Sequence, residues 1–265
     1  MKRGWIKLNK GWRIFATGMC FALFGIGGLA LTFIVFPLLT FSCKNKARRE
    51  LKVQKTIQIS FFLFCETMRI SGAIDYQIIG ADKLKKDRNC LVIANHPSLI
   101  DYVLITSRLK QCDCLVKETI WNNPFMRGVV TSAGYIPNKD PEKLLINCEE
   151  RLSKGHVLLV FPEGTRTTAG LSSKLQRGAA QIALKTASDL RVVHITVDPL
   201  FLTKQSKWYQ VPDKKPFFLV DVKDKVLINE FINSEELPSL TVRKLNKHLD
   251  GVLFPSKQVK KDATA

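Results

Sequence analysis

The chain has 265 residues, 46% of them hydrophobic, and carries 41 lysines and arginines against 23 aspartates and glutamates, a formal net charge of +18. This length suits one domain of ordinary size with an appendage. It is long enough to bury a sizeable hydrophobic core. The charge points to an anionic partner, which could be nucleic acid, an anionic membrane surface or an acidic protein.

The first predicted element is a membrane anchor in residues 14–41, a run of 28 residues without a charge. About 20 apolar residues span a bilayer core, and the apolar part of a signal peptide is only about 7–15 residues long. We therefore interpret the run as a retained anchor. Basic residues flank it on both sides: Lys2, Arg3, Lys7, Lys10 and Arg13 before it, and Lys44, Lys46, Arg48, Arg49, Lys52 and Lys55 after it.

These two basic flanks leave two arrangements open, because positive charge normally marks the cytoplasmic end of a span. One arrangement is a simple span whose denser C-terminal cluster stays in the cytoplasm. The other is a re-entrant or monotopic helix pair, bent near residues 25–28 (GIGG). Both place the following domain in the cytoplasm, on anionic lipid.

Residues 51–74 complete the predicted anchoring region, residues 1–73. They are apolar but include Glu66 and Arg69, which is typical of an amphipathic helix at the membrane interface. A core helix of the soluble domain explains them equally well. The seven cysteines show no zinc-binding spacing, so we expect free thiols and no metal.

After residue 74, strand-like and helix-like segments alternate. The predicted strands are residues 73–80, 90–95, 114–117, 134–137, 156–161, 192–197 and 217–222. The clearest predicted helices are residues 141–154, 176–188 and 235–249. This alternation predicts an α/β domain over residues 74–255, with a mostly parallel central sheet flanked by helices and followed by a basic tail, residues 256–265.

Two predicted strand ends carry polar residues suited to chemistry, and ligands of such sheets bind at the C-terminal ends of strands. At the first, His96 leaves the strand, Pro97 is predicted to begin a helix, and Asp101 lies just over one turn into it. Helical side chains tilt towards the helix N-terminus, so Asp101 is expected to reach back and orient His96 as a general base. A histidine that caps a helix in a structural role is the alternative.

The second strand end has the sequence FPEGTR, residues 161–166. It delivers Glu163, Thr165 and Arg166 to the same rim, with Gly164 between them. Gly164 permits close approach of a ligand to the backbone, and the planar fork of Arg166 suits a phosphate. An ordinary solvated turn is the alternative, because Pro-Glu-Gly is common in turns.

Together, NHPSLID (95–101) and VFPEGTR (160–166), behind a basic-flanked anchor, resemble the glycerolipid acyltransferases with their HX4D and FPEGTR motifs. This family includes the lysophosphatidic acid and glycerol-3-phosphate acyltransferases, and the resemblance covers about residues 75–200. It implies that His96 deprotonates an acceptor hydroxyl that attacks an acyl thioester, while Asp101 orients His96, without an acyl-enzyme, metal or cofactor. It also implies that the phosphoglycerol part of the acceptor is bound by Glu163, Gly164, Thr165 and Arg166.

The implied donor is acyl-CoA or an acidic acyl carrier protein, and the implied acceptor is a lysophospholipid, 1-acylglycerol-3-phosphate, giving phosphatidate. The anchor resembles that of bacterial members, which implies the cytoplasmic face of a bacterial inner membrane. Two departures leave another hydroxylated lipid open as the acceptor. Where the family shows a glycine and then a phosphate-gripping arginine, this chain has Gly134 and Lys139, one place short and a point charge. His194 stands where the family usually has a proline.

Two other function classes fit less well. A non-catalytic basic module that binds a membrane or nucleic acid would lack any recognition motif or aromatic-interleaved basic stripe, so no nucleic-acid partner is expected. A lipid esterase would need a nucleophile, and Ser98 is not surrounded by a glycine-flanked elbow.

Overall fold

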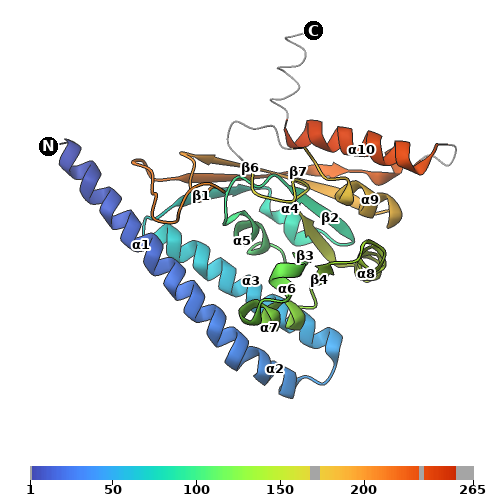
Figure 1. Cartoon of the computed structure of the whole chain (residues 1–265), viewed down its shortest axis with the longest axis horizontal. Helices are drawn as coiled ribbons and strands as arrows, with labels where there is room; N and C mark the ends of the chain where they lie inside the picture. Colours follow the sequence, from blue (N-terminus) through green and yellow to red (C-terminus); the bar gives the residue numbers. More distant parts are fainter. Residues whose placement is uncertain (1, 168–173, 233–235, 255–265) are drawn as a thin grey trace, which may run out of the picture.

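The computed structural model describes residues 2–167, 174–232 and 236–254, and its centre is a seven-stranded sheet (Figure 1). The strands are β1 (Asp75–Ile79), β2 (Cys90–Ala94), β3 (Asp113–Lys117), β4 (Ile136–Asn138), β5 (Val157–Val160), β6 (Asp189–Asp198) and β7 (Phe217–Val226). Their order is β1-β7-β6-β2-β5-β3-β4. Strands β2 to β6 run parallel, whereas β7 is antiparallel to β6 and parallel to β1. The predicted mostly parallel sheet is confirmed.

Helices precede the first strand, connect several of the strands and follow the last one. They are α1 (Lys2–Ala30), the π-helical turn η1 (Leu31–Val35), α2 (Phe36–Ser42), α3 (Lys46–Ile70), α4 (Ala81–Lys86), α5 (Asp101–Thr106), α6 (Glu118–Trp121), α7 (Pro124–Ser132), α8 (Pro141–Ser153), α9 (Gly178–Lys185), the 3-10 turn η2 (Ile228–Glu230) and α10 (Pro238–Leu253). Helix α8 begins as predicted, because the side chain of Asp140 accepts the Glu142 and Lys143 N–H groups. Helix α9 is shorter than predicted at both ends, and the predicted tail 256–265 lies outside the described residues.

The sheet is covered on both faces, which explains why β2 is apolar at every position. Cys90, Val92 and Ala94 point into one core with α1, α3 and α5. Leu91 and Ile93 point into a second core with α8, α9 and α10. In Figure 1 these two groups of helices lie on opposite sides of the sheet.

The N-terminal helices form a hairpin, but not at the predicted glycines. The bend near residues 25–28, which belonged to one of the two arrangements left open by the sequence, is not found: these residues lie inside α1, which continues through η1 into α2. The chain turns instead at residues 43–45, where the side chain of Asn45 caps α3 by accepting the Arg48 N–H at 3.0 Å. A glycine weakens a helix by about 1 kcal/mol but keeps its backbone hydrogen bonds, so glycines alone do not end one.

Helix α1 has one face on the domain and one apolar face exposed. Arg13, Ala16, Thr17 and Cys20 are at most 3% exposed. The opposite stripe follows helical spacing, with exposed Leu8, Trp12, Phe15, Met19, Leu23 and Ile26. By length and composition, the helical stretch Lys7–Ser42 could cross a membrane. Helix α3 packs Val53, Ile57 and Met68 into the cores, as a core helix does.

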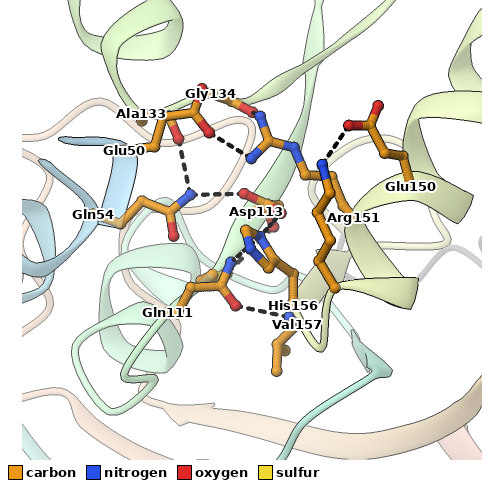
Figure 2. A network of polar contacts seen from close by, with 12 residues as sticks. Glu50, Gln54, Gln111, Asp113, Ala133, Gly134, Glu150, Arg151, His156 and Val157 are labelled. Atoms are coloured by element: carbon orange, nitrogen blue, oxygen red, sulfur yellow. Dashed lines mark hydrogen bonds and ion pairs between the residues drawn. The ribbon is translucent and has the colours of Figure 1, made fainter. Parts of the chain in front are cut away.

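A buried polar network ties α3 to the amino-terminal edge of the sheet (Figure 2). The Gln54 amide of α3 donates to Asp113 Oδ1 at 2.7 Å and to the Ala133 carbonyl at 2.8 Å. Arg151 of α8 pairs with Glu50 of α3 at 2.6 Å. His156, directly before β5, places its Nδ1 2.7 Å from Asp113 Oδ2. The network therefore fixes the hairpin to the α/β domain.

Candidate active site

The carboxyl-terminal end of β2 is fixed by Asn95. Its side-chain amide donates to the Ile195 carbonyl at 2.8 Å and accepts the Ile195 N–H at 2.6 Å. These two bonds lock the strand end to the neighbouring β6. The residue that follows, His96, therefore leaves the sheet from a rigid base.

The structure brings His96 and Asp101 together as predicted. His96 Nδ1 lies 2.9 Å from Asp101 Oδ2, which also accepts the Ser98 N–H at 2.7 Å. The predicted helix start at Pro97 is wrong, because α5 begins at Asp101 itself. The Leu99 N–H is bonded to the Leu202 carbonyl at 2.9 Å, which holds residues 97–100 in a non-helical turn that folds back over the carboxylate.

The electrostatics of the pair suit a base and its orienter. Asp101 is fully buried, and this burial raises its pKa to about 6, against the opposing effect of the hydrogen bonds from His96 and Ser98. At neutral pH the carboxylate accepts the Nδ1–H of the ring. In a neutral imidazole this leaves the lone pair on Nε2, ready to take a proton.

A stacking contact sets the plane of the His96 ring, and burial removes Ser98 as a rival nucleophile. The His96 ring stacks on Phe161, with centroids 4.1 Å apart and an interplanar angle of 21°, and its side chain stays 18% exposed. Ser98 is fully buried, so its hydroxyl is not presented to a substrate.

Glu163, after β5, joins the second motif to the first. It is 4% exposed, and its Oε1 accepts the His96 backbone N–H at 2.9 Å and the Thr167 hydroxyl at 2.8 Å. The Thr167 N–H in turn donates to the His96 carbonyl at 2.7 Å. Glu163 of the FPEGTR segment and Thr167, the residue after it, therefore bind the backbone N–H and carbonyl of His96.

The remaining residues of that loop line the rim. Gly164 adopts a left-handed conformation, with φ of +67°, that favours glycine, and Thr165 is exposed. Arg166 donates through Nη1 to the carbonyls of Leu202 at 3.2 Å and Thr203 at 2.9 Å. One part of its fork is therefore bound to the backbone after β6.

Lys139 also lies at the carboxyl ends of the parallel strands but is further from His96 than the FPEGTR loop is. It follows β4, three strands from β2, a distance of about 14 Å at about 4.8 Å per strand. Its Nζ pairs with Glu118 Oε1 at 2.9 Å, and its side chain is 69% exposed. The structure does not bring it into the cluster around His96.

Three contributors were not assigned a role from the sequence: Asn95, Phe161 and Thr167. Asn95 and Phe161 lie inside the two quoted motifs, and Thr167 follows directly. Their closeness in sequence to His96 and Glu163 was the only indication of a role that the sequence offered for these three residues. Their partners were not predictable, because those contacts depend on how the β2, β5 and β6 ends meet.

An open apolar groove of about 700 Å³ begins at Leu99, in the turn between His96 and Asp101. It is lined by Ile14, Phe15, Gly18, Met19, Phe21, Ala22, Leu99 and Trp208. Leu99 lies between His96 and Asp101 in the chain, so one end of the groove lies at the turn that carries the histidine–aspartate pair, and the groove extends from there along α1. This arrangement can remove a proton from the polar end of a molecule whose apolar part lies in the groove.

Comparisons with known proteins bear on the family and the fold. Residues 75–202 match the protein-family model described as Acyltransferase. The chain is 27% identical over 191 residues to the chloroplastic 1-acyl-sn-glycerol-3-phosphate acyltransferase BAT2 of Brassica napus, covering 68% of this chain and 52% of the relative. It is 24% identical over 160 residues to a 1-acyl-sn-glycerol-3-phosphate acyltransferase of Pseudomonas aeruginosa, covering 58% of this chain and 59% of the relative. The chain thus spans a little over half the length of these curated relatives.

A solved structure shares the fold. The 1-acyl-sn-glycerophosphate (LPA) acyltransferase PlsC from Thermotoga maritima superposes with a TM-score of 0.60 at 20% identity, covering 96% of this chain and 99% of that chain. This likeness includes the N-terminal helical hairpin in its coverage and supports the α/β architecture.

Proposed function

Because residues 75–202 belong to the Acyltransferase family, we propose that this chain transfers a fatty acyl group from an acyl thioester to the hydroxyl of a lysophospholipid. The proposed acceptor is 1-acyl-sn-glycerol-3-phosphate and the product is phosphatidate, in line with the names of the relatives. The observation that carries the proposal is the His96–Asp101 pair, 2.9 Å apart, on a turn whose Leu99 lines an apolar groove.

In the proposed reaction His96 Nε2 takes the proton of the acceptor hydroxyl as its oxygen attacks the thioester carbonyl. Asp101 stabilises the imidazolium that forms. The tetrahedral intermediate then collapses, the C–S bond breaks, and the departing thiolate takes the proton from the imidazolium. The thioester is already activated, so the reaction needs alignment and a base rather than a metal, a cofactor or an enzyme nucleophile.

Glu163 has a positioning role in this proposal. Its buried carboxylate already accepts two hydrogen bonds, one of them from the His96 backbone, and a carboxylate would repel the acceptor phosphate. The phosphoglycerol is proposed to contact Gly164, Thr165 and the N–H groups of Arg166 that do not bind the Leu202 and Thr203 carbonyls. Lys139 is proposed as a more distant phosphate contact on the same edge.

The donor is proposed to be acyl-CoA or an acidic acyl carrier protein. Both are anionic, and the formal charge of +18 attracts either of them. The same charge favours an anionic membrane surface.

The chain is proposed to lie on the cytoplasmic leaflet of a bacterial inner membrane without crossing it. Exposed apolar residues continue beyond α1 through η1 and α2, from Leu8 to Phe41. This stretch runs for about 50 Å at 1.5 Å per residue, longer than a bilayer core of about 30 Å. The opposite face of α1 and η1 stays on the domain, from the Lys10–Asp213 ion pair to Thr32 of η1 beside Gly128. A perpendicular span would pull the domain into the lipid.

Incubating extracted lipids with a labelled acyl donor and the purified, membrane-reconstituted chain tests the acceptor. Label should appear in phosphatidate alone, and a His96→Ala preparation should give none above background. Label in a different lipid would overturn the acceptor and favour the alternative suggested by Lys139. Label in free fatty acid only would overturn acyl transfer in favour of hydrolysis.

A further inference from the structure

The loop between β6 and β7, residues 199–216, lies beside the N-terminal half of α1 (Figure 1, orange-brown beside blue). Arg13 of α1 donates to the carbonyls of Pro212 at 2.8 Å and Asp213 at 2.7 Å. Lys10 pairs with the Asp213 carboxylate at 2.8 Å. Because Arg13 is only 3% exposed, the loop is fixed to the helix rather than resting against it.

The outer side of this β6–β7 loop presents two adjacent aromatic rings. Trp208 is 48% exposed and Tyr209 is 44% exposed, and Lys207 Nζ lies 5.7 Å from the centroid of the Tyr209 ring. Tryptophan and tyrosine with neighbouring lysines are typical of the boundary between lipid headgroups and hydrocarbon, where an apolar body and a polar tip are both satisfied.

These rings continue the apolar stripe of α1. The Trp208 ring lies so close to Gly18 that a Cβ there would meet it at 3.0 Å, and Trp208 and Phe15 line the same groove. Large contiguous apolar patches that are exposed to solvent mark interaction sites. The loop and the helix stripe therefore form one surface.

The charge of the loop selects the partner. It carries four lysines, Lys204, Lys207, Lys214 and Lys215, against one aspartate, Asp213. Asp213 pairs with Lys10 and Lys215 pairs with Asp75 at 2.7 Å, so the charge offered to a partner comes from the other three lysines. Basic residues next to interfacial aromatic rings are complementary to an anionic leaflet.

The start of the loop is bonded to the active-site turn. The Leu202 carbonyl accepts the Leu99 N–H at 2.9 Å and one N–H of Arg166. The Thr203 carbonyl accepts the same guanidinium at 2.9 Å. The position of the loop is thereby coupled to the positions of Leu99 and Arg166.

We propose that the β6–β7 loop is a second membrane-contact element: Trp208 and Tyr209 enter the headgroup region of an anionic leaflet, and the loop holds Leu99 and Arg166 at that depth. The loop thus places the mouth of the groove against the lipid from which the acceptor comes. This inference rests on the membrane association proposed above.

Tryptophan quenching in nanodiscs tests the placement. The full chain is reconstituted in phosphatidylcholine–phosphatidylglycerol nanodiscs whose acyl chains are brominated close to the headgroup, and wild type is compared with Trp208→Phe and Trp12→Phe. Each substitution should remove a bromine-quenched component, from the loop and from α1 respectively. If only Trp12→Phe removes a quenched component, the loop contact alone is overturned. If neither substitution removes one, the membrane association is overturned as well. Catalysis does not enter the readout, so a failed acyl-transfer assay leaves it unaffected.

A matched pair of charge reversals tests the role of the lysines. The loop variant is Lys204→Glu, Lys207→Glu and Lys214→Glu, and the control is Lys185→Glu, Arg243→Glu and Lys247→Glu on α9 and α10. All six side chains are exposed, and α9 and α10 cover the opposite face of the sheet from α1. The loop variant should lose at least about half of the Trp208 quenching, because each cation near an anionic surface contributes to binding, while the control keeps it. Equal quenching in both variants would overturn the proposal.

Discussion

Among residues 2–167, 174–232 and 236–254, two histidine–aspartate pairs have nearly the same local geometry, one at the carboxyl ends of the parallel strands and one at their amino ends. In the pair formed by His96 and Asp101 the Nδ1–Oδ2 distance is 2.9 Å, and in the pair formed by His156 and Asp113 it is 2.7 Å. Both aspartates are fully buried, and the two histidine side chains are 18% and 17% exposed.

The surroundings of the two pairs differ. His96 follows the carboxyl end of β2 and adjoins an apolar groove through Leu99. His156 precedes β5, and its Nδ1 also contacts Gln111 Nε2 at 2.9 Å within the network of Figure 2. A histidine–aspartate distance therefore does not identify a base. The neighbours decide whether the pair performs chemistry or, as with Asp113, joins α3 to the sheet.

Replacing each histidine gives the largest expected contrast. His96→Ala should lower kcat/KM for acyl transfer by about 10²–10⁴, the usual contribution of a general base. His156→Ala should change the rate per folded molecule little, because its ring lies at the amino ends of the parallel strands, away from His96. Labelled acyl transfer, normalised to folded protein in membranes, measures both. Equal losses would contradict the division of roles.

Substituting Asp101 should mainly lower activity, whereas substituting Asp113 should mainly lower stability. Asp101→Asn can no longer hold the Nδ1–H tautomer of His96, so activity should fall about 10²-fold or more with the fold retained. Asp113→Asn removes a buried charged acceptor from the network and should cost about 1–3 kcal/mol in the free energy of unfolding. Thermal unfolding and activity are measured on both variants. A stable, inactive Asp113→Asn protein would contradict the assignment.

Glu163 distinguishes positioning of the base from acceptor binding. Glu163→Ala leaves the His96 N–H without its acceptor, which should lower kcat about 10-fold, corresponding to about 1.4 kcal/mol of activation free energy. Glu163→Gln keeps an accepting oxygen and should restore most of that loss. Steady-state kinetics with varied acceptor measure the split. A rise in the acceptor KM in both variants, with kcat unchanged, would instead indicate direct acceptor binding.

The raised pKa of Asp101, about 6, predicts opposite pH trends for activity and stability. Activity should fall as the pH drops through about 6, because the protonated carboxyl no longer accepts the Nδ1–H of His96. The folded state holds this proton more tightly than the unfolded state, where the pKa is about 3.9. The stabilisation is therefore full below about pH 4 and is lost as the pH rises through 6, by on the order of 3 kcal/mol. Asp101→Asn should flatten this part of the stability profile, as measured by unfolding at several pH values.

The sheet and the first pair were predictable because they depend on short-range patterns. The apolar run at residues 90–94 signals a strand buried on both faces, and strand ends of parallel sheets meet at one edge. His96 and Asp101 are five residues apart, so a single turn brings them together even though the helix begins four residues later than predicted.

The long-range contacts were not predictable from the sequence. The bond from the His96 N–H to Glu163 spans 67 residues and exists only because β2 and β5 are neighbours. Gly134 was interpreted through the family resemblance as the start of a phosphate-binding segment. The structure shows that it adopts a φ of +70° at the amino edge of β4, where a Cβ would lie 2.6 Å from Arg151 Nη2 and from the Glu50 side chain. Close packing therefore requires a glycine there.

The two faces of α1 have a consequence for how a membrane grows. A helix that keeps the domain on one flank and lipid on the other attaches to a single side of the bilayer. Under the proposed reaction, every new phosphatidate is released into that same monolayer, which expands while the opposite one does not. Balanced enlargement of the envelope then requires a separate process that carries lipid across.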